Sequence, residues 1–148
     1  MRRFVWSGGL TVAVAVALVL AGSASGVPAT RASKPLPHAS EGRCPKLRMQ
    51  RLGADAVARA ATAALAQAPA VYRGTNLKGM RATKSVLARF DDPGRGGYAR
   101  VKCGRGAQAK TVVVYLEFPA MRPSASLSQG VVLVSKFAGE YRVWAQLH

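Results

Sequence analysis

The sequence predicts an α+β fold, with one main helix packed on a curved four-stranded antiparallel sheet, after a cleaved signal peptide. Three patterns support this prediction. An uncharged apolar run lies near the N-terminus, an alanine-rich segment follows with helical periodicity, and the rest of the chain has β-branched and aromatic residues with a period of two. We divide the 148 residues into 1–29 as signal peptide, 30–43 as disordered linker and 44–148 as a single domain.

The first 29 residues have the three parts of a secretory signal. Arg2 and Arg3 precede the apolar run 10–21, and small residues follow it. A membrane-spanning helix needs about 20 apolar residues, and this run is shorter. Cleavage after Ala24 or Ala29 fits the small residues best, and an uncleaved N-terminal anchor is the alternative. The expected location is secreted or extracytoplasmic, with no integral membrane span after cleavage.

Residues 30–43 contain Pro35 and Pro37 and show no apolar periodicity, which is typical of a disordered linker. Residues 54–68 have the pattern of the main helix. Proline lacks the amide hydrogen that a helix interior needs, so Pro69 is expected to end it. The apolar face expected to contact the sheet is Val57, Ala61, Ala64, Leu65 and Ala68.

Period-two alternation and turn residues predict the strands that follow. Residues 111–118 are the strongest candidate, because they are β-branched and aromatic. Val112, Val114, Leu116 and Phe118 form an apolar face suited to the helix. The other strand candidates are 80–90 (weak), 98–103, 131–137 and 140–147, with turn chemistry at 91–97.

A tight hairpin turn at Ala138 and Gly139 sets the register of the last two strands. This register pairs Ser135 with Arg142, Leu133 with Trp144, and Val131 with Gln146. It places Val134 with Val143, and Val132 with Ala145, on the opposite face. The sheet face away from the helix would then carry aromatic and basic side chains, and we expect it to be a ligand or homodimer surface made of Tyr98, Arg100, Lys102, Tyr115, Leu133, Arg142 and Trp144.

One helix followed by an antiparallel meander that ends in Gly139-Glu140-Tyr141-Arg142-Val143-Trp144 resembles the cystatin-like roll. Within that roll it is most similar to the nuclear transport factor 2-like superfamily, whose members often close with a Gly-x-aromatic-basic-aliphatic strand. The resemblance covers residues 50–148. That family includes isomerases and cyclases with an acidic or histidine base, and also non-enzymatic pocket and dimer modules. No base of this chain matches by position, so the resemblance implies a fold and not an activity.

The two cysteines, Cys44 and Cys103, are expected to form a disulfide, since an exported chain meets an oxidising environment. Free thiols are the alternative. These cysteines with His38 and His148 lack the spacing of a zinc site, so we expect no metal. No motif calls for a cofactor.

The charge is strongly positive, with 22 Lys and Arg against 6 Asp and Glu and a formal net charge of +16. Such a charge draws a protein toward polyanions. Anionic envelope polymers or surfaces are the expected partners. Nucleic acid is not, because no nucleic-acid-binding signature occurs and export removes that partner. The cations are scattered along the chain, so a merely solvated basic surface is the alternative.

Glu117 is the one acidic residue in the interior of a predicted strand, because Glu140 lies at the hairpin turn; there burial would raise the pKa of Glu117 toward that of a general base. The alternative is an ion pair with Arg or Lys of a neighbouring strand. We therefore expect a secreted, non-enzymatic binding or interaction module of unknown ligand. The alternative function is a small pocket enzyme that uses Glu117.

Overall fold

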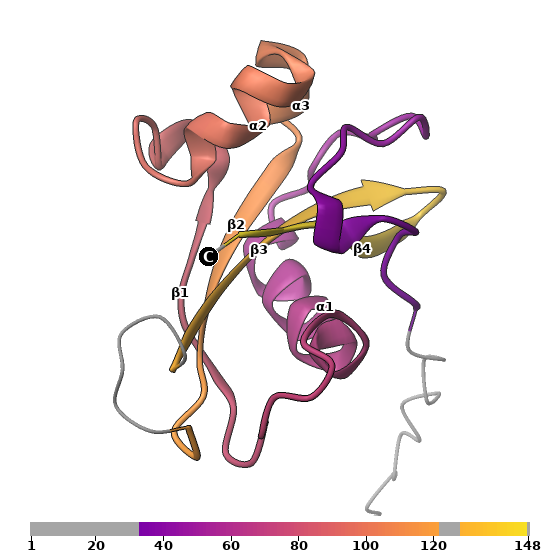
Figure 1. Ribbon diagram of the computed structural model, residues 1–148. Coiled ribbons are helices and arrows are strands. Elements are labelled where there is room, and N and C mark those ends of the chain that lie inside the picture. The colour runs from indigo at the N-terminus through magenta and orange to yellow at the C-terminus, as the bar shows by residue number, and fades with distance from the viewer. Residues whose placement is uncertain (1–32, 122–127, 148) are drawn as a thin grey trace, which may run out of the picture. The chain divides into compact units, whose positions relative to one another are not determined.

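The protein is an α+β molecule with a four-stranded antiparallel sheet, as the sequence predicts (Figure 1). The computed structural model describes residues 33–121 and 128–147, so the predicted signal peptide lies outside the described residues. The strands follow the order β1-β2-β3-β4 across the sheet. The elements are η1 (Ala39–Glu41), α1 (Ala56–Val71), β1 (Arg81–Leu87), η2 (Ala88–Phe90), α2 (Gly96–Cys103), α3 (Arg105–Gln108), β2 (Thr111–Glu117), β3 (Gln129–Phe137) and β4 (Glu140–Leu147).

Helix α1 is the predicted main helix, but Pro69 does not end it. Pro69 lies in the last turn and the helix continues to Val71, because a proline so close to the C-terminus removes only one of the final hydrogen bonds. The buried face is also rotated from the predicted one. Alanines at four-residue intervals and Gln67 are buried, whereas Val57, Ala61 and Leu65 are half-buried; the buried alanines are Ala56, Ala60, Ala64 and Ala68.

The first core lies between α1 and one face of the sheet. This core contains the four side chains that were predicted to face the helix. Three belong to β2 and the fourth directly follows it: Val112, Val114, Leu116 and Phe118. Alanine has almost no side chain, so α1 can lie close to the β-branched residues of the sheet. Figure 1 shows α1 packed across the strands.

Gln67 joins α1 to β4, which is an edge strand. Its buried amide donates a hydrogen bond to the carbonyl of Tyr141 at 2.9 Å and accepts one from the amide of Val143 at 2.9 Å. The carbonyl of Val143 accepts a hydrogen bond from the amide of Leu36 at 2.8 Å. Edge strands expose unpaired backbone groups that invite aggregation, and these contacts satisfy part of that edge.

Residues 98–103 form all but the first two residues of α2, so the prediction of a strand there is wrong. The segment is short, and Ala99 and Cys103 are spaced four residues apart as well as being alternate residues. In the helix both of them pack into the same apolar cluster. The segment therefore follows the helical spacing. The period of two that predicted a strand was supported by only a few residues.

The hairpin between β3 and β4 turns at Ala138 and Gly139, as predicted, and both residues have positive φ (47° and 90°). Ser135 pairs with Arg142 and Val134 with Val143, also as predicted. The register then shifts between Leu133 and Val134, so the other predicted pairs are wrong. Leu133 lies opposite Ala145, Val132 opposite Gln146 and Val131 opposite Leu147.

The shift is a β-bulge that leaves Trp144 as the extra residue of β4. Trp144 and the next residue, Ala145, both lie in the apolar cluster on the sheet face opposite α1, which we call the second core. The bulge thus keeps the Trp144 side chain on the face predicted for it, while reversing the alternation for the residues that follow.

The second face of the sheet is covered and not open. Leu36 and Met49 from the N-terminal segment and Ala88 and Ala99 from the η2–α2 region pack on it. Residues 33–43, which were predicted to belong to a disordered linker, pack on the fold instead: Leu36 and Ala39 are buried, and Ala39 begins η1. In the described parts of the chain, no helix is long and apolar enough to cross a membrane.

Candidate anion-binding site

The seven residues predicted to form a binding face do not form one exposed surface. Tyr98, Arg100 and Lys102 lie on α2 and not on the sheet. Tyr98 donates a hydrogen bond to the carbonyl of Gly42 at 2.9 Å. Arg100 pairs with Asp92 at 2.9 Å. These contacts attach α2 to its neighbours.

The four strand residues of that predicted face hold the fold together. Leu133 and Trp144 are buried in the second core, with Trp144 only 1% exposed. Arg142 donates a hydrogen bond to the carbonyl of Lys34 at 2.8 Å and so holds the N-terminal segment. Tyr115 is half-buried and bonded to Asp91. Without local unfolding, Leu133 and Trp144 cannot contact a ligand or a second copy.

Glu117 forms an ion pair with Arg81 of β1, the neighbouring strand, at 2.7 Å. Its side chain is about one-third exposed, and Arg81↔Glu117 is also a register pair of β1 and β2. An exposed carboxylate held by a guanidinium lacks the burial that would make it a general base. Within the described residues, no cluster of His, Cys, Asp and Glu could hold a metal ion.

Asp91 forms the centre of a polar cluster in the loop that the sequence marks as a turn. Its carboxylate accepts hydrogen bonds from Tyr115 Oη at 2.7 Å, Lys84 Nζ at 3.0 Å and the amide of Gly96 at 3.1 Å. Burial alone would raise the pKa of Asp91, but these bonds and the charge of Lys84 outweigh it and hold the pKa below its usual range. Burial and the adjacent Asp91 raise the pKa of Tyr115 to about 12.

The Asp91 cluster predicts acid sensitivity. A carboxylate whose folded pKa is lowered stabilises the fold above its unfolded pKa, about 3.9, and this stabilisation is lost as the pH falls through the folded value. Below pH 4 the melting temperature of the wild type should therefore fall more steeply with pH than that of Asp91→Asn, which has no carboxylate charge to lose. Melting temperatures measured at several pH values test this. Parallel curves for the two proteins would show that Asp91 does not couple folding to pH.

Most carboxylates of the described chain form an ion pair with a cation. The other cations of the described chain have no carboxylate partner. The ion pairs are Glu41 with Arg43, Asp55 with Arg59, Asp91 with Lys84, Asp92 with Arg100 and Glu117 with Arg81. Within the described residues, no ion pair involves Arg48, Arg51, Arg89, Lys110 or Lys136, and these five line adjoining hollows of the surface.

The segment between the disulfide and α1 carries two of these cations. Cys44 and Cys103 are bonded, with their Cα atoms 5.4 Å apart, which attaches the start of this segment to the end of α2. Met49 is buried in the second core, and the amide of Gln50 donates to the carbonyl of Lys136 at 2.8 Å. Arg48 and Arg51 are consequently exposed on either side of two anchored residues.

Lys110 and Lys136 are brought together by the register of β2 and β3. Thr111 pairs with Ser135, and their buried hydroxyls are 2.9 Å apart. The residues next to this pair, Lys110 and Lys136, both line the same hollow. Two ammonium groups that line one hollow repel each other, and an anion bound between them reduces that repulsion.

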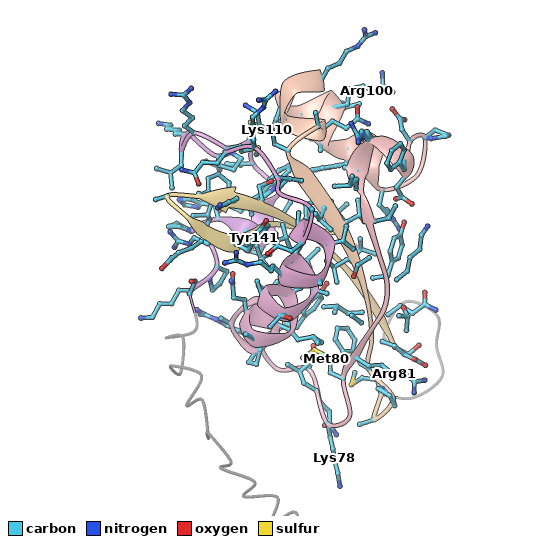
Figure 2. All side chains as sticks on the ribbon, turned by 180° about the vertical axis from the view of Figure 1, so that it is seen from behind. Lys78, Met80, Arg81, Arg100, Lys110 and Tyr141 are labelled. Carbon is cyan, nitrogen blue, oxygen red and sulfur yellow. A yellow bond between two sulfur atoms is a disulfide. The ribbon has the colours of Figure 1, made fainter. Side chains whose placement is uncertain are left out.

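Two hollows adjoin at Arg51 and Lys110, and together we call them the basic groove. The hairpin hollow has a volume of about 670 Å³, and its cations are Arg48, Arg51, Lys110 and Lys136. The helix hollow, of about 660 Å³, lies beside the start of α1, and its cations are Arg51, Arg89 and Lys110. Among the described residues, no Asp or Glu lines either hollow. Figure 2 shows Lys110 near α2 and α3, at the opposite end from Lys78.

The basic groove was not predicted from the sequence. The composition shows the positive charge, but the predicted binding surface followed aromatic residues on the strands. The groove cations come from a loop, a short 3-10 helix and two strand ends, where no periodic pattern exists. Lys110 directly precedes the predicted strand 111–118, and Lys136 is the next-to-last residue of the predicted strand 131–137, so their position at strand ends was the available signal.

Comparison of the chain with protein-family models, with curated proteins and with solved structures finds no match. What the basic groove can bind is therefore judged from its own residues.

Proposed function

We propose that the protein is exported and acts as a non-enzymatic module that binds an anionic polymer of the cell envelope through the basic groove. The observation that carries the proposal is the groove itself: within the described residues its five cations form no ion pair, and no carboxylate lines the two hollows that they line. An anion bound there gains charge-assisted hydrogen bonds and relieves the repulsion of Lys110 and Lys136.

Two further observations support export. The N-terminal residues have the charge and hydropathy pattern of a secretory signal, and the Cys44–Cys103 bond belongs to an oxidising compartment. The pocket-enzyme alternative has no comparable support, because Glu117 is paired with Arg81 and lines neither hollow of the groove.

Charge reversal at the groove should weaken polyanion binding. Using protein secreted by an exporting host and long-chain polyphosphate as the probe, we expect Lys110→Glu to lower affinity more than tenfold. Lys78→Glu makes the same change in net charge at the opposite end of the molecule, so it is the matched control and should cost only a few-fold. Binding measured by calorimetry or anisotropy at several salt concentrations checks this.

Equal losses in Lys110→Glu and Lys78→Glu would show that only the net charge matters and would contradict a built site. Circular dichroism of both variants establishes that they are folded. Arg51→Gln, at an exposed position, provides a second groove variant that carries no risk to the core.

A further inference from the structure

We infer that the basic groove takes a linear polymer of phosphate groups, lying along both hollows, and not a single compact anion. This inference rests on the proposed function and names the class of ligand. The cations are spread along the groove, with Lys136 and Arg48 in the hairpin hollow, Arg51 and Lys110 where the hollows adjoin, and Arg89 in the helix hollow. A compact anion occupies one hollow and leaves the cations of the other without a partner.

The side chains of the groove favour phosphate. Arg48, Arg51 and Arg89 present planar guanidinium groups, which bind phosphate oxygens in pairs, and Lys110 adds a compact charge. The two free oxygens of a chain phosphate point in different directions, so Arg51 and Lys110 can contact one phosphate from different sides. The oxygens of a carboxylate lie in one plane and suit a single guanidinium.

The apolar part of the groove points to recognition of the charged backbone and not of attached rings. Phe137 is the aromatic residue that lines the hairpin hollow, and it is buried, at 2% exposed. Single-stranded nucleic acids bind through exposed aromatic rings on which their bases stack. Among the residues that line the two hollows, none offers such a ring, and the exposed Phe90 lies outside both linings. A polymer whose charge lies in its backbone fits better.

Arg89 distinguishes a ligand that occupies one hollow from a ligand that lies along both. It follows β1 and is exposed. It lines the helix hollow but not the hairpin hollow. Its guanidinium lies 4.6 Å from the ring centroid of Phe90, a cation–π contact that restrains it without neutralising its charge. A short anion held where the hollows adjoin, at Arg51 and Lys110, does not need Arg89, whereas a long chain does.

Chain length therefore tests the inference. We would measure the affinity of wild type and Arg89→Gln for triphosphate, for long-chain polyphosphate and for long-chain polyglutamate at one salt concentration. Arg89→Gln should weaken long-chain polyphosphate binding about tenfold and change triphosphate binding less than twofold. Polyglutamate should bind wild type at least tenfold more weakly than polyphosphate of matched charge. Arg73→Gln is the matched control, because Arg73 lies beyond the far end of α1, about 24 Å along a helix of this length, and should change neither affinity.

Each other result has a definite meaning. If Arg89→Gln affects both chain lengths equally, or neither, while Lys110→Glu still lowers affinity more than tenfold, the ligand is a compact anion and the inference is wrong although the proposed function stands. Polyglutamate binding as tightly as polyphosphate would overturn the choice of phosphate. Failure of wild type to bind any probe would overturn the proposed function as well.

Discussion

Replacing Cys44 and Cys103 together with alanine is expected to lower the free energy of unfolding by about 4 kcal/mol. The bond closes a long loop, with a sequence separation of 59, and in the unfolded chain it removes much of the conformational entropy. At about 3 °C per kcal/mol for a domain of this size, the melting temperature should fall by roughly 10 °C or more. Thermal unfolding followed by circular dichroism, with and without reductant, measures the change.

The same substitution should also weaken polyanion binding. The disulfide holds the start of the segment that carries Arg48 and Arg51, and a third hollow, lined by Cys44, Cys103 and Lys110, shows how close the bond lies to the groove. Freeing one end of this segment adds an entropic cost to ordering its two guanidinium groups around a ligand. The double alanine variant is the control for reduction, since reductant should not change its melting temperature. A wild type that is equally insensitive to reductant would show that the cysteines are not bonded.

The strong elements of the fold were predictable from the sequence because several signals agreed there. Strand β2 is β-branched from Thr111 to Val114, and its alternate residues Val112, Val114 and Leu116 lie in the core with the helix as expected. The turn at Ala138 and Gly139 was predictable because glycine adopts positive φ without strain, and the flanking strands both continue to it.

The errors arose where the sequence pattern did not distinguish between alternatives. Residues 98–103 are few, and the spacing of Ala99 and Cys103 fits a helix as well as a strand. The bulge at Trp144 was hidden because β3 and β4 are apolar on both faces, so a shift of one residue leaves the pattern of hydrophobicity unchanged. The segments that pack on the sheet face opposite α1 explain why β3 and β4 are apolar on both faces. A sheet that is buried on both faces has no polar face to reveal its register.

The candidate site was less predictable than the fold. Net charge is a property of composition, but the position of each cation depends on which carboxylates lie within reach. Arg81 and Arg100 look the same in sequence as Arg48 and Arg51, yet the first two are held by Glu117 and Asp92 and the second two are not. That difference depends on tertiary contacts between residues far apart in the chain.

Trp144→Ala is expected to lower the free energy of unfolding by about 3–5 kcal/mol, which is the usual cost of truncating a buried tryptophan. Trp144 is 1% exposed, and its Nε1 donates a hydrogen bond to Ser135 Oγ at 3.0 Å. Ser135 in turn contacts Thr111, whose hydroxyl donates to the carbonyl of Ala107 at 2.8 Å. The indole therefore completes a buried polar chain directly beside Lys110 and Lys136, so its loss should loosen the groove as well as the core.

The measurement is denaturant unfolding followed by circular dichroism, with Trp144→Phe as the matched control. Phenylalanine keeps most of the apolar volume and loses the donor to Ser135, so it should cost only about 1–2 kcal/mol. Since a small domain has only about 5–15 kcal/mol of stability, the alanine variant should be close to unfolding at growth temperature. If Trp144→Ala instead unfolds at the wild-type midpoint but no longer binds ligand or self-associates, Trp144 acts at a surface, as the aromatic pattern of the strands first suggested, and the buried position described above is wrong.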